Sequence, residues 1–205
     1  MSKAFLILGS SAAGCAGVAG LVYLKSSGTQ RPKISLREKF ENEIVGKVLL
    51  DFVGTTHDAV WEELVAEYKR DSGKPSLGEL SRTSLNKEQL KLHCKKEASE
   101  TEIDRFNSYL ELCSRNTLRT QFNDKVTGKK WIDSTQESDW ESKKTGYAVD
   151  SKTNEQVPKS GASGTIAKND IQTKNIMDWC GSQVNIPYVK DSDDTYTRAL
   201  ALCTQ

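Results

Sequence analysis

The chain is poor in histidine and has no excess of either charge. Its 205 residues include two histidines, and its 29 Lys plus Arg residues almost balance its 28 Asp plus Glu residues. A nucleic-acid-binding protein would carry a clustered basic excess, so this balance argues against that class. His57 and His93 lack the spacing of zinc ligands, and there is no C-x-x-C motif. Because no Ser/His/Asp or Cys/His set can be assembled either, we predict no catalytic, cofactor-binding or metal-binding residue.

One uncharged segment, residues 4–24 (AFLILGSSAAGCAGVAGLVYL), is long enough to cross a membrane. As a helix it would span roughly 30 Å, the thickness of the hydrocarbon core of a bilayer. Its glycines are not followed by the Lys-Ser/Thr pair of a phosphate-binding loop. We therefore expect residues 1–26 to form a signal-anchor helix, with residues 4–24 in the lipid bilayer. A cleaved signal peptide and a lipoprotein modified at Cys15 are the alternatives.

Two signals disagree about the side of the membrane on which the body lies. The basic residues that follow the apolar segment are Lys25, Arg31, Lys33, Arg37 and Lys39. Since only Lys3 precedes it, the positive-inside rule places the body in the cytoplasm. The cysteine pattern, described below, favours the outside. In either case we expect residues 27–47 to be a juxtamembrane linker.

Landmarks recur in the same order along the rest of the chain, and we interpret it as two repeat units, residues 48–115 and 116–205. The paired landmarks are Asp51 and Asp133, Trp61 and Trp140, Cys94 and Cys180, and Cys113 and Cys203. Apolar spacing predicts three short helices in each unit, with a short strand as the alternative for the polar first helix of the second unit. The predicted fold class is mainly α: an N-terminal transmembrane helix followed by two small repeated helical units.

Four capping-box patterns mark predicted helix starts. They are Asn86-x-x-Gln89, Ser99-x-x-Glu102, Ser138-x-x-Glu141 and Asn169-x-x-Gln172. The tryptophans are interpreted as core residues rather than as a ligand cage, and they are Trp61, Trp131, Trp140 and Trp179. The connector Lys152–Lys168 is rich in Gly, Ser and Lys, and we expect it to be a mobile loop.

Each unit contains two cysteines at equivalent positions, Cys94 and Cys113 in the first and Cys180 and Cys203 in the second. An even number of cysteines in a small, hydrophilic body fits disulfide bonds. We predict the structural disulfides Cys94–Cys113 and Cys180–Cys203, because both units could then fold alike. Each bond would contribute roughly 3 kcal/mol in the chain-entropy model. Four buried free thiols are the alternative, favoured if the body lies in the cytoplasm.

Two acidic features have simple structural explanations. Asp51 and Asp133 stand ahead of a helix at matching positions, where capping or turn formation accounts for them without acid–base chemistry. The run Asp191, Asp193 and Asp194 lacks the Gly and the distal Glu of a calcium-binding EF-hand loop. We expect this run to begin a helix, because negative charge there is favourable to the helix dipole.

Three features together resemble a known group of proteins. They are the start MSKAFLILGSSAAGCAGVAGLVYL, the LLD…W…YK element, and the helices that end in Cys-Ser or Cys-Thr. The group is the paralogous, uncharacterised proteins of haemotropic mycoplasmas. The resemblance covers essentially the whole chain, although the second unit departs from the pattern between Tyr147 and Asn169. It implies membrane association, surface exposure and antigenic diversification, and it carries over no activity, cofactor or site residue.

The leading prediction is a single-pass protein of the cell membrane that has its body outside the cell and is not an enzyme. Its partners would be the lipid bilayer, through residues 4–24, and a host or neighbouring surface protein, in a contact or antigenic role. No nucleic acid, small-molecule ligand or cofactor is predicted. The alternative is a cytoplasm-facing, membrane-bound scaffold or adaptor without catalytic activity. A hydrolase using Asp51 or Asp133 is a more distant hypothesis.

Overall fold

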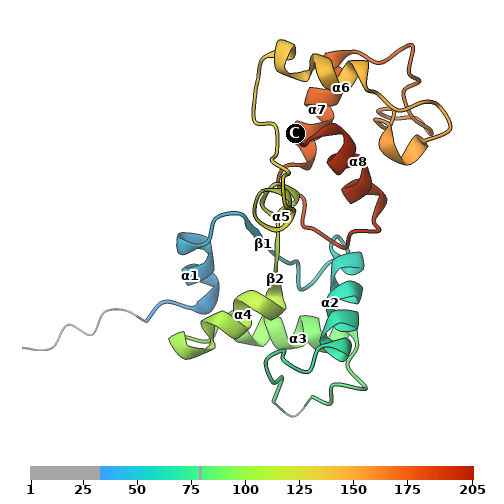
Figure 1. The fold of residues 1–205 in the computed structure, drawn as a ribbon. Helices are drawn as coiled ribbons and strands as arrows, with labels where there is room; N and C mark the ends of the chain where they lie inside the picture. Colours follow the sequence, from blue (N-terminus) through green and yellow to red (C-terminus); the bar gives the residue numbers. More distant parts are fainter. Residues whose placement is uncertain (1–32, 79) are drawn as a thin grey trace, which may run out of the picture. The chain divides into compact units, whose positions relative to one another are not determined.

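The computed structural model describes residues 33–78 and 80–205 (Figure 1). The described residues contain eight α-helices and a two-stranded sheet. The prediction of a mainly α fold is therefore confirmed. Two hydrophobic cores are present, one with its buried residues between Leu36 and Cys113 and the other between Leu118 and Cys203. We call residues 33–116 the first half and residues 117–205 the second half.

The first half consists of four α-helices, one 3₁₀ helix and the sheet. In chain order these are α1 (Leu36–Glu43), β1 (Lys47–Leu49), α2 (Asp58–Arg70), α3 (Lys87–Glu97), η1 (Ile103–Arg105), α4 (Phe106–Cys113) and β2 (Ser114–Asn116). The two strands pair antiparallel, with Lys47 opposite Asn116 and Leu49 opposite Ser114. Since β2 directly follows α4, the sheet joins the end of the half to its beginning.

The second half is built from helices and isolated β-bridges. Its helices are α5 (Leu118–Lys125), η2 (Glu137–Trp140), α6 (Glu141–Thr145), η3 (Thr153–Glu155), α7 (Thr173–Gln183) and α8 (Asp194–Leu202). Trp131 pairs with Thr204 in an antiparallel bridge, and Pro158 pairs with Thr165 in another. The polar element around Trp140, for which a strand was the alternative, is helical.

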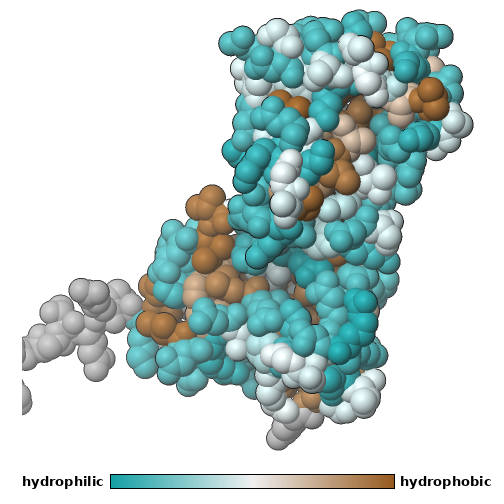
Figure 2. Space-filling model, viewed as in Figure 1, coloured by the Kyte–Doolittle hydropathy of each residue, from teal (hydrophilic) through white to brown (hydrophobic). Residues whose placement is uncertain are grey.

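The predicted anchor, residues 4–24, and Cys15 lie outside the described residues. Within residues 33–78 and 80–205, no helix combines the length and the apolar character needed to cross a membrane. Apolar side chains gather at the surface over α1 (Figure 2). Ile34 and Val45, which flank α1, are 40% and 96% exposed.

The stretch 27–47, expected to be a linker, contains the helix α1 instead. The Ser35 side chain accepts a hydrogen bond from the Glu38 amide at 3.1 Å, and the Glu38 carboxylate accepts one from the Ser35 amide at 2.9 Å. This is a capping box, which fixes the start of the helix. Leu36 and Phe40 lie one turn apart and are buried in the first core. Such an apolar pair anchors a two-turn helix even though most of its other residues are charged.

The helix α5 matches α1 in sequence and in structure. Residues 35–51 and 117–133 align without a gap, with identical residues at the positions of Leu36, Arg37, Phe40, Gly46, Lys47 and Asp51. Thr117 caps α5 by accepting a hydrogen bond from the Thr120 amide at 3.1 Å. Leu118 and Phe122, the counterparts of the buried residues of α1, are buried in the second core.

A glycine in the left-handed region follows each of these two helices. The φ angle is 79° at Gly46 and 72° at Gly128, where a residue with a Cβ atom is strained. A Cβ atom at Gly46 would lie 2.4 Å from Oγ1 of Thr120, whereas nothing lies within 4 Å of one at Gly128. The turn therefore requires glycine at both positions, and close packing adds a second requirement at Gly46.

The two halves form the same hydrogen bond from a buried tryptophan. The indole nitrogen of Trp61 donates to the Asp51 carbonyl at 3.0 Å, and that of Trp140 donates to the Ser134 carbonyl at 3.0 Å. Asp51 and Asp133 are matched in the two halves, so the second acceptor lies one residue beyond its counterpart. Both bonds tie the tryptophan to the segment that follows β1 in the first half and the bridge residue Trp131 in the second.

Another matched pair of hydrogen bonds closes each half. The Leu50 amide donates to the Cys113 carbonyl at 3.1 Å, and the Ile132 amide donates to the Cys203 carbonyl at 2.8 Å. The bridge between Trp131 and Thr204 in the second half likewise corresponds to the pairing of Leu49 with Ser114 in the first half. The end of the last helix is thus bound to the same early segment in both halves.

Each half contains one disulfide bond, in the pairing that the sequence predicts. Cys94 is joined to Cys113 with an S–S distance of 2.03 Å, and Cys180 is joined to Cys203 at 1.95 Å. All four residues are fully buried. The bonds link α3 to the end of α4 and α7 to the end of α8, so each crosses the centre of its own core.

The predicted helix starts are only partly correct. The capping box Asn86–Gln89 is confirmed at α3. The box of α7 is Gln172–Asn175, one turn later than the predicted start at Asn169. The boxes predicted at Ser99 and Ser138 are wrong, because these hydroxyls donate to nearby oxygens and the helices that follow have no side-chain cap.

Arg115 in β2 connects the two halves. Its guanidinium donates two hydrogen bonds to the Glu67 carboxylate, at 2.9 and 2.5 Å. It also donates to the backbone carbonyls of Tyr188 and Val189, at 3.3 and 3.0 Å. A planar guanidinium is suited to such a set of acceptors, so one side chain joins α2 to the segment that precedes α8.

Candidate functional site

Each half has a pocket beside the helix that carries the first cysteine of its disulfide. In the second half α7 lines a cavity of about 780 Å³, and in the first half α3 lines one of about 750 Å³. In both halves the loop that precedes this helix lines the pocket as well. The two pockets therefore have the same place in their halves and nearly the same size.

The helix residues that line the two pockets are in register. Four lining residues of α3, namely Gln89, Leu92, His93 and Lys96, match the four of α7, namely Asn175, Asp178, Trp179 and Ser182. Glu97 of α3 also lines its pocket and has no counterpart in the other. Each residue of the first set is as far from Cys94 as its counterpart is from Cys180. The buried faces keep their character, with Leu90 matched to Ile176 and the two cysteines matched to each other. Three of the four lining pairs, in contrast, differ in chemistry.

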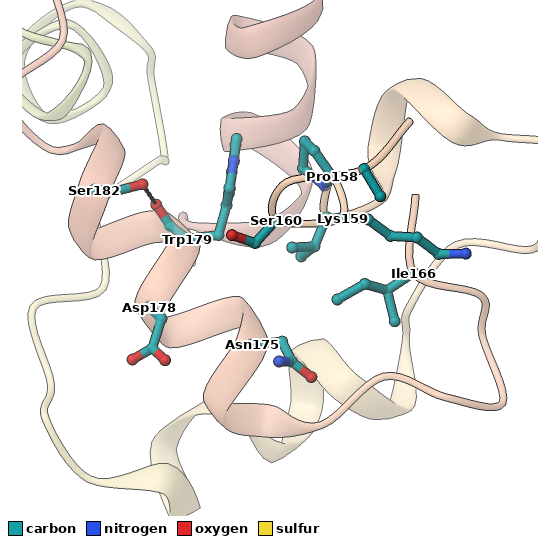
Figure 3. A pocket seen from close by; sticks show the side chains of 10 residues that line it. Pro158, Lys159, Ser160, Ile166, Asn175, Asp178, Trp179 and Ser182 are labelled. Atoms are coloured by element: carbon teal, nitrogen blue, oxygen red, sulfur yellow. Dashed lines mark hydrogen bonds between the residues drawn. The ribbon is translucent and has the colours of Figure 1, made fainter. Parts of the chain in front are cut away.

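The pocket of the second half lies between α7 and the loop 157–166 (Figure 3). Trp179 stands on α7 beside Asn175 and Asp178, and Pro158 and Ser160 come from the loop. Trp179 is only half-buried, so the prediction that it is a core residue is correct only in part. The other three tryptophans are 5% exposed or less.

A tyrosine binds the pocket loop in each half. The Tyr68 hydroxyl donates to the Pro75 carbonyl at 2.8 Å, and the Tyr147 hydroxyl donates to the Ile166 carbonyl at 3.1 Å. In both halves this tyrosine follows the buried tryptophan by seven residues. Burial raises the pKa of Tyr147, so its hydroxyl stays protonated and able to donate.

The connector Lys152–Lys168, expected to be a mobile loop, is tied down by buried polar contacts. Gln156 is 1% exposed, and its side-chain oxygen accepts a hydrogen bond from the Thr165 hydroxyl at 2.6 Å. Arg198 of α8 donates to the Gln156 carbonyl at 2.5 Å and places its guanidinium 5.8 Å from the ring centre of Trp179. These contacts hold the loop and the tryptophan in fixed positions on the two sides of the pocket.

The pocket of the first half has a different charge. Its lining includes Lys96, Arg105 and His93, and the single carboxylate among its lining residues is that of Glu97. Burial raises the pKa of Glu97, which is bound to the Arg105 guanidinium. Burial also lowers the pKa of His93, and Arg105 and Lys96 lower it further, so the imidazole is neutral at neutral pH. The ammonium group of Lys96 leaves this pocket with a net positive charge.

The aspartates considered for acid–base chemistry have structural roles. The Asp51 carboxylate accepts hydrogen bonds from the Val53 and Gly54 amides at 2.9 and 3.0 Å, which lowers its pKa. Asp133 is exposed and pairs with Arg119 at 2.7 Å. Asp193 accepts hydrogen bonds from two amides at the start of α8, as predicted for the acidic run. Among the described residues no cluster of His, Cys, Asp and Glu could hold a metal ion.

Comparison with protein-family models, curated proteins and solved structures found no match for this chain. The candidate site therefore stands on the geometry of the two pockets. No motif points to their lining residues. The register of each helix relative to its disulfide cysteine is the one signal in the sequence that could have located them.

Proposed function

We propose that the chain is a single-pass membrane-anchored surface protein whose body, a tandem duplication, lies outside the cell. Residues 4–24 would hold it in the bilayer. It would act by contact with a host molecule or a neighbouring surface protein, or as an antigen, and not as an enzyme. The resemblance to the proteins of haemotropic mycoplasmas supports the same location.

The observation that carries this proposal is the pair of matched disulfides. Structural disulfides persist in oxidising compartments and are rare in the cytoplasm, where thiols are kept reduced. Here both bonds are buried at the centre of a small core, Cys94–Cys113 in one half and Cys180–Cys203 in the other. A small core gains much from such a bond, because closing a loop of this length contributes about 3 kcal/mol. An outward-facing body accounts for both the number and the positions of these cysteines.

The paired pockets support a role in recognition. The buried pair Leu90 and Cys94 of α3 corresponds to Ile176 and Cys180 of α7, whereas the residues that line the two pockets differ in charge and in aromatic character. Such a pattern fits one scaffold that presents two different contact sites. It also fits the absence of an acid–base pair at Asp51 and Asp133, which are engaged in a turn and in an exposed ion pair.

The exposed apolar residues beside α1 support an anchor close to the body. Ile34 and Val45 flank the first described helix, which follows the predicted membrane segment after a short stretch. Such residues lower their free energy when they touch an apolar surface. A bilayer held nearby by residues 4–24 would provide one.

The alternative, a cytoplasm-facing scaffold or adaptor, has one specific observation in its favour. The basic residues that follow the apolar segment fit the positive-inside rule. Two of them, however, belong to the folded helix α1, where Arg37 pairs with Glu41 at 2.8 Å and Lys39 pairs with Glu43 at 2.6 Å. The basic residues outside a folded element therefore number fewer than the sequence suggests.

Trypsin treatment of intact cells tests the proposal. The body is rich in Lys and Arg, so a body on the surface would be cut while a cytoplasmic marker protein stays whole. A body that survives until the cells are lysed would contradict the proposal and favour the scaffold.

As a control, a membrane-impermeant maleimide applied before and after lysis reports on the cysteines of the body. A cytoplasmic body would react at all four cysteines after lysis and denaturation without reductant, whereas a surface body would react at none.

A further inference from the structure

The pocket of the second half contains an aromatic ring with an unused hydrogen-bond donor. The indole nitrogens of Trp61 and Trp140 donate to backbone carbonyls. Those of Trp131 and Trp179 have no acceptor within residues 33–78 and 80–205, and both nitrogens keep some exposure to solvent. Trp131 is only 5% exposed, so Trp179 has the more accessible ring of the two. Trp179 lines the pocket and is half-buried. Its ring and its N–H group are therefore both accessible from the solvent side.

The polar groups near this ring include hydrogen-bond donors and acceptors. The Asn175 side-chain oxygen accepts from the Gln172 amide at 3.0 Å, which leaves its NH₂ group available. Ser160 supplies a hydroxyl (Figure 3). The Asp178 carboxylate pairs with Lys174 at 2.9 Å, and the side chains of Asp178 and Lys159 are both exposed. Because Asp178 is already paired and Lys159 is solvated, no buried charge in the lining favours an ionic ligand.

From this arrangement we propose that the pocket of the second half binds a neutral sugar ring. A pyranose has an apolar face of C–H groups and a rim of hydroxyls, each of which can donate and accept hydrogen bonds. Trp179 would pack against the apolar face, as aromatic side chains do with flat apolar surfaces. The Asn175 amide and the Ser160 hydroxyl would bind rim hydroxyls, which fits a pocket with few polar groups that fix the ligand's orientation.

The construction of the pocket supports a ligand of defined shape. Its loop is held by the buried side chain of Gln156 and by Arg198, which also lies over the Trp179 ring. Ordering a Gly- and Ser-rich loop costs conformational entropy, and these contacts meet that cost before any ligand binds. The matched pocket of the first half has His93 in the place of Trp179 and Leu92 in the place of Asp178. It lacks the sugar-binding set and provides a natural control.

This inference rests on the proposed function, since it names the class of surface molecule that the second half would contact. The test uses the full-length protein in a detergent without a sugar head group, because maltoside or glucoside detergents would compete. The probes are methyl glycosides of glucose, galactose, N-acetylglucosamine and N-acetylgalactosamine, observed by saturation-transfer NMR. At least one is expected to receive saturation at its C–H protons and to bind about tenfold more weakly to Trp179→Ala.

Two further variants separate binding from folding. Trp179→Phe keeps a flat ring and loses the N–H donor, so it should retain part of the affinity. His93→Ala changes the matched pocket and should leave binding unaltered. Intact disulfides and an unchanged thermal midpoint would show that Trp179→Ala is folded.

Binding that is equal in Trp179→Ala, or no saturation transfer from any of the four glycosides, would overturn the proposal. Binding of a pool of short neutral peptides that depends on Trp179, without sugar binding, would also overturn it and assign the pocket to peptides. These outcomes are distinct from a failure of the proposed function. A protein that trypsin removes from intact cells but that ignores sugars keeps its surface role, whereas sugar binding by a body protected inside the cell loses it.

Discussion

Replacing both Cys180 and Cys203 by alanine is expected to lower the local stability of the second half and to leave that of the first half nearly unchanged. The bond closes a loop with a sequence separation of 23 residues, which corresponds to about 3 kcal/mol in the chain-entropy model. Both sulfurs are fully buried, and their loss leaves a small cavity that costs about 1 kcal/mol more. The expected loss, about 4 kcal/mol, is a large fraction of the 5–15 kcal/mol that stabilises an ordinary domain.

Hydrogen exchange followed by mass spectrometry on the full-length protein measures this loss locally. Amides of α7 and α8 are expected to exchange about a thousandfold faster, since each 1.4 kcal/mol corresponds to a factor of ten. Amides of α3 should change little, because Cys94–Cys113 remains in its separate core. The matched variant Cys94→Ala with Cys113→Ala should reverse the pattern.

Reduction of the unmodified protein with a phosphine provides the control for cavity formation, because it breaks the bond and keeps the sulfur atoms. Because it breaks both bonds, it should reproduce most of the effect in each half at once. In the Cys180→Ala, Cys203→Ala variant, an acceleration of less than tenfold in α7 and α8, or an equal effect in both halves, would refute the reasoning that each disulfide stabilises its own core.

Three further changes test other parts of the structure. His57 Nδ1 accepts a hydrogen bond from the Asp51 amide at 2.9 Å, and burial lowers the pKa of this histidine. The unfolded state therefore binds the proton more tightly than the folded state does. The free energy of unfolding, measured by urea titration, should fall as the pH drops below about 6.5, the ordinary pKa of histidine. His57→Asn, which can accept the same bond without titrating, should flatten this dependence. Gly128→Ala should lower the free energy of unfolding by roughly 1 kcal/mol, because its φ angle is strained for alanine. Gly46→Ala should lower it further, because of these two positions only Gly46 lacks room for a Cβ atom. Equal shifts of the thermal midpoint in the two variants would contradict this. Arg115→Met should lower the free energy of unfolding, measured by urea titration, by about 2 kcal/mol, a value that allows for the partial exposure of its partner Glu67. No measurable loss would show that other contacts join the two halves.

The helical class and the cysteine pairing could be predicted because each depends on local or arithmetic signals. Apolar spacing in α2 places Trp61, Leu64 and Tyr68 on one face, and all three are buried. The disulfides follow from two equivalent cysteines per unit. These signals need no knowledge of which surfaces meet in three dimensions.

The helix α1 was missed although the sequence contains its match. Residues 35–51 align with 117–133 without a gap, but α1 has only two buried residues and is otherwise highly charged. Beside an apolar segment, that charge resembles a membrane flank. Its burial depends on tertiary contacts, such as the hydrogen bond from the Leu36 amide to the Glu100 carbonyl at 2.7 Å, which no local pattern reveals.

The capping boxes and the pocket show a second limit. A Ser followed three residues later by Glu caps a helix only if its hydroxyl accepts a hydrogen bond from the first turn. The hydroxyls of Ser99 and Ser138 instead donate to the Lys96 carbonyl and the Asp139 carboxylate. Trp179 precedes Cys180 and so lies away from the buried face of α7, a position that the 3.6-residue period could have indicated. The pocket loop could not be predicted, because its conformation depends on the burial of Gln156 and on Arg198, which is 42 residues away in sequence.

The redox state of the body cysteines in the native membrane tests the proposed surface location most directly. Cells are treated with N-ethylmaleimide before lysis, and the protein is digested and mapped by mass spectrometry without reduction. The proposal predicts two linked peptide pairs, Cys94 with Cys113 and Cys180 with Cys203, and no label on any of the four. Maleimide on these cysteines in the native protein would place the body in a reducing compartment and contradict the proposal.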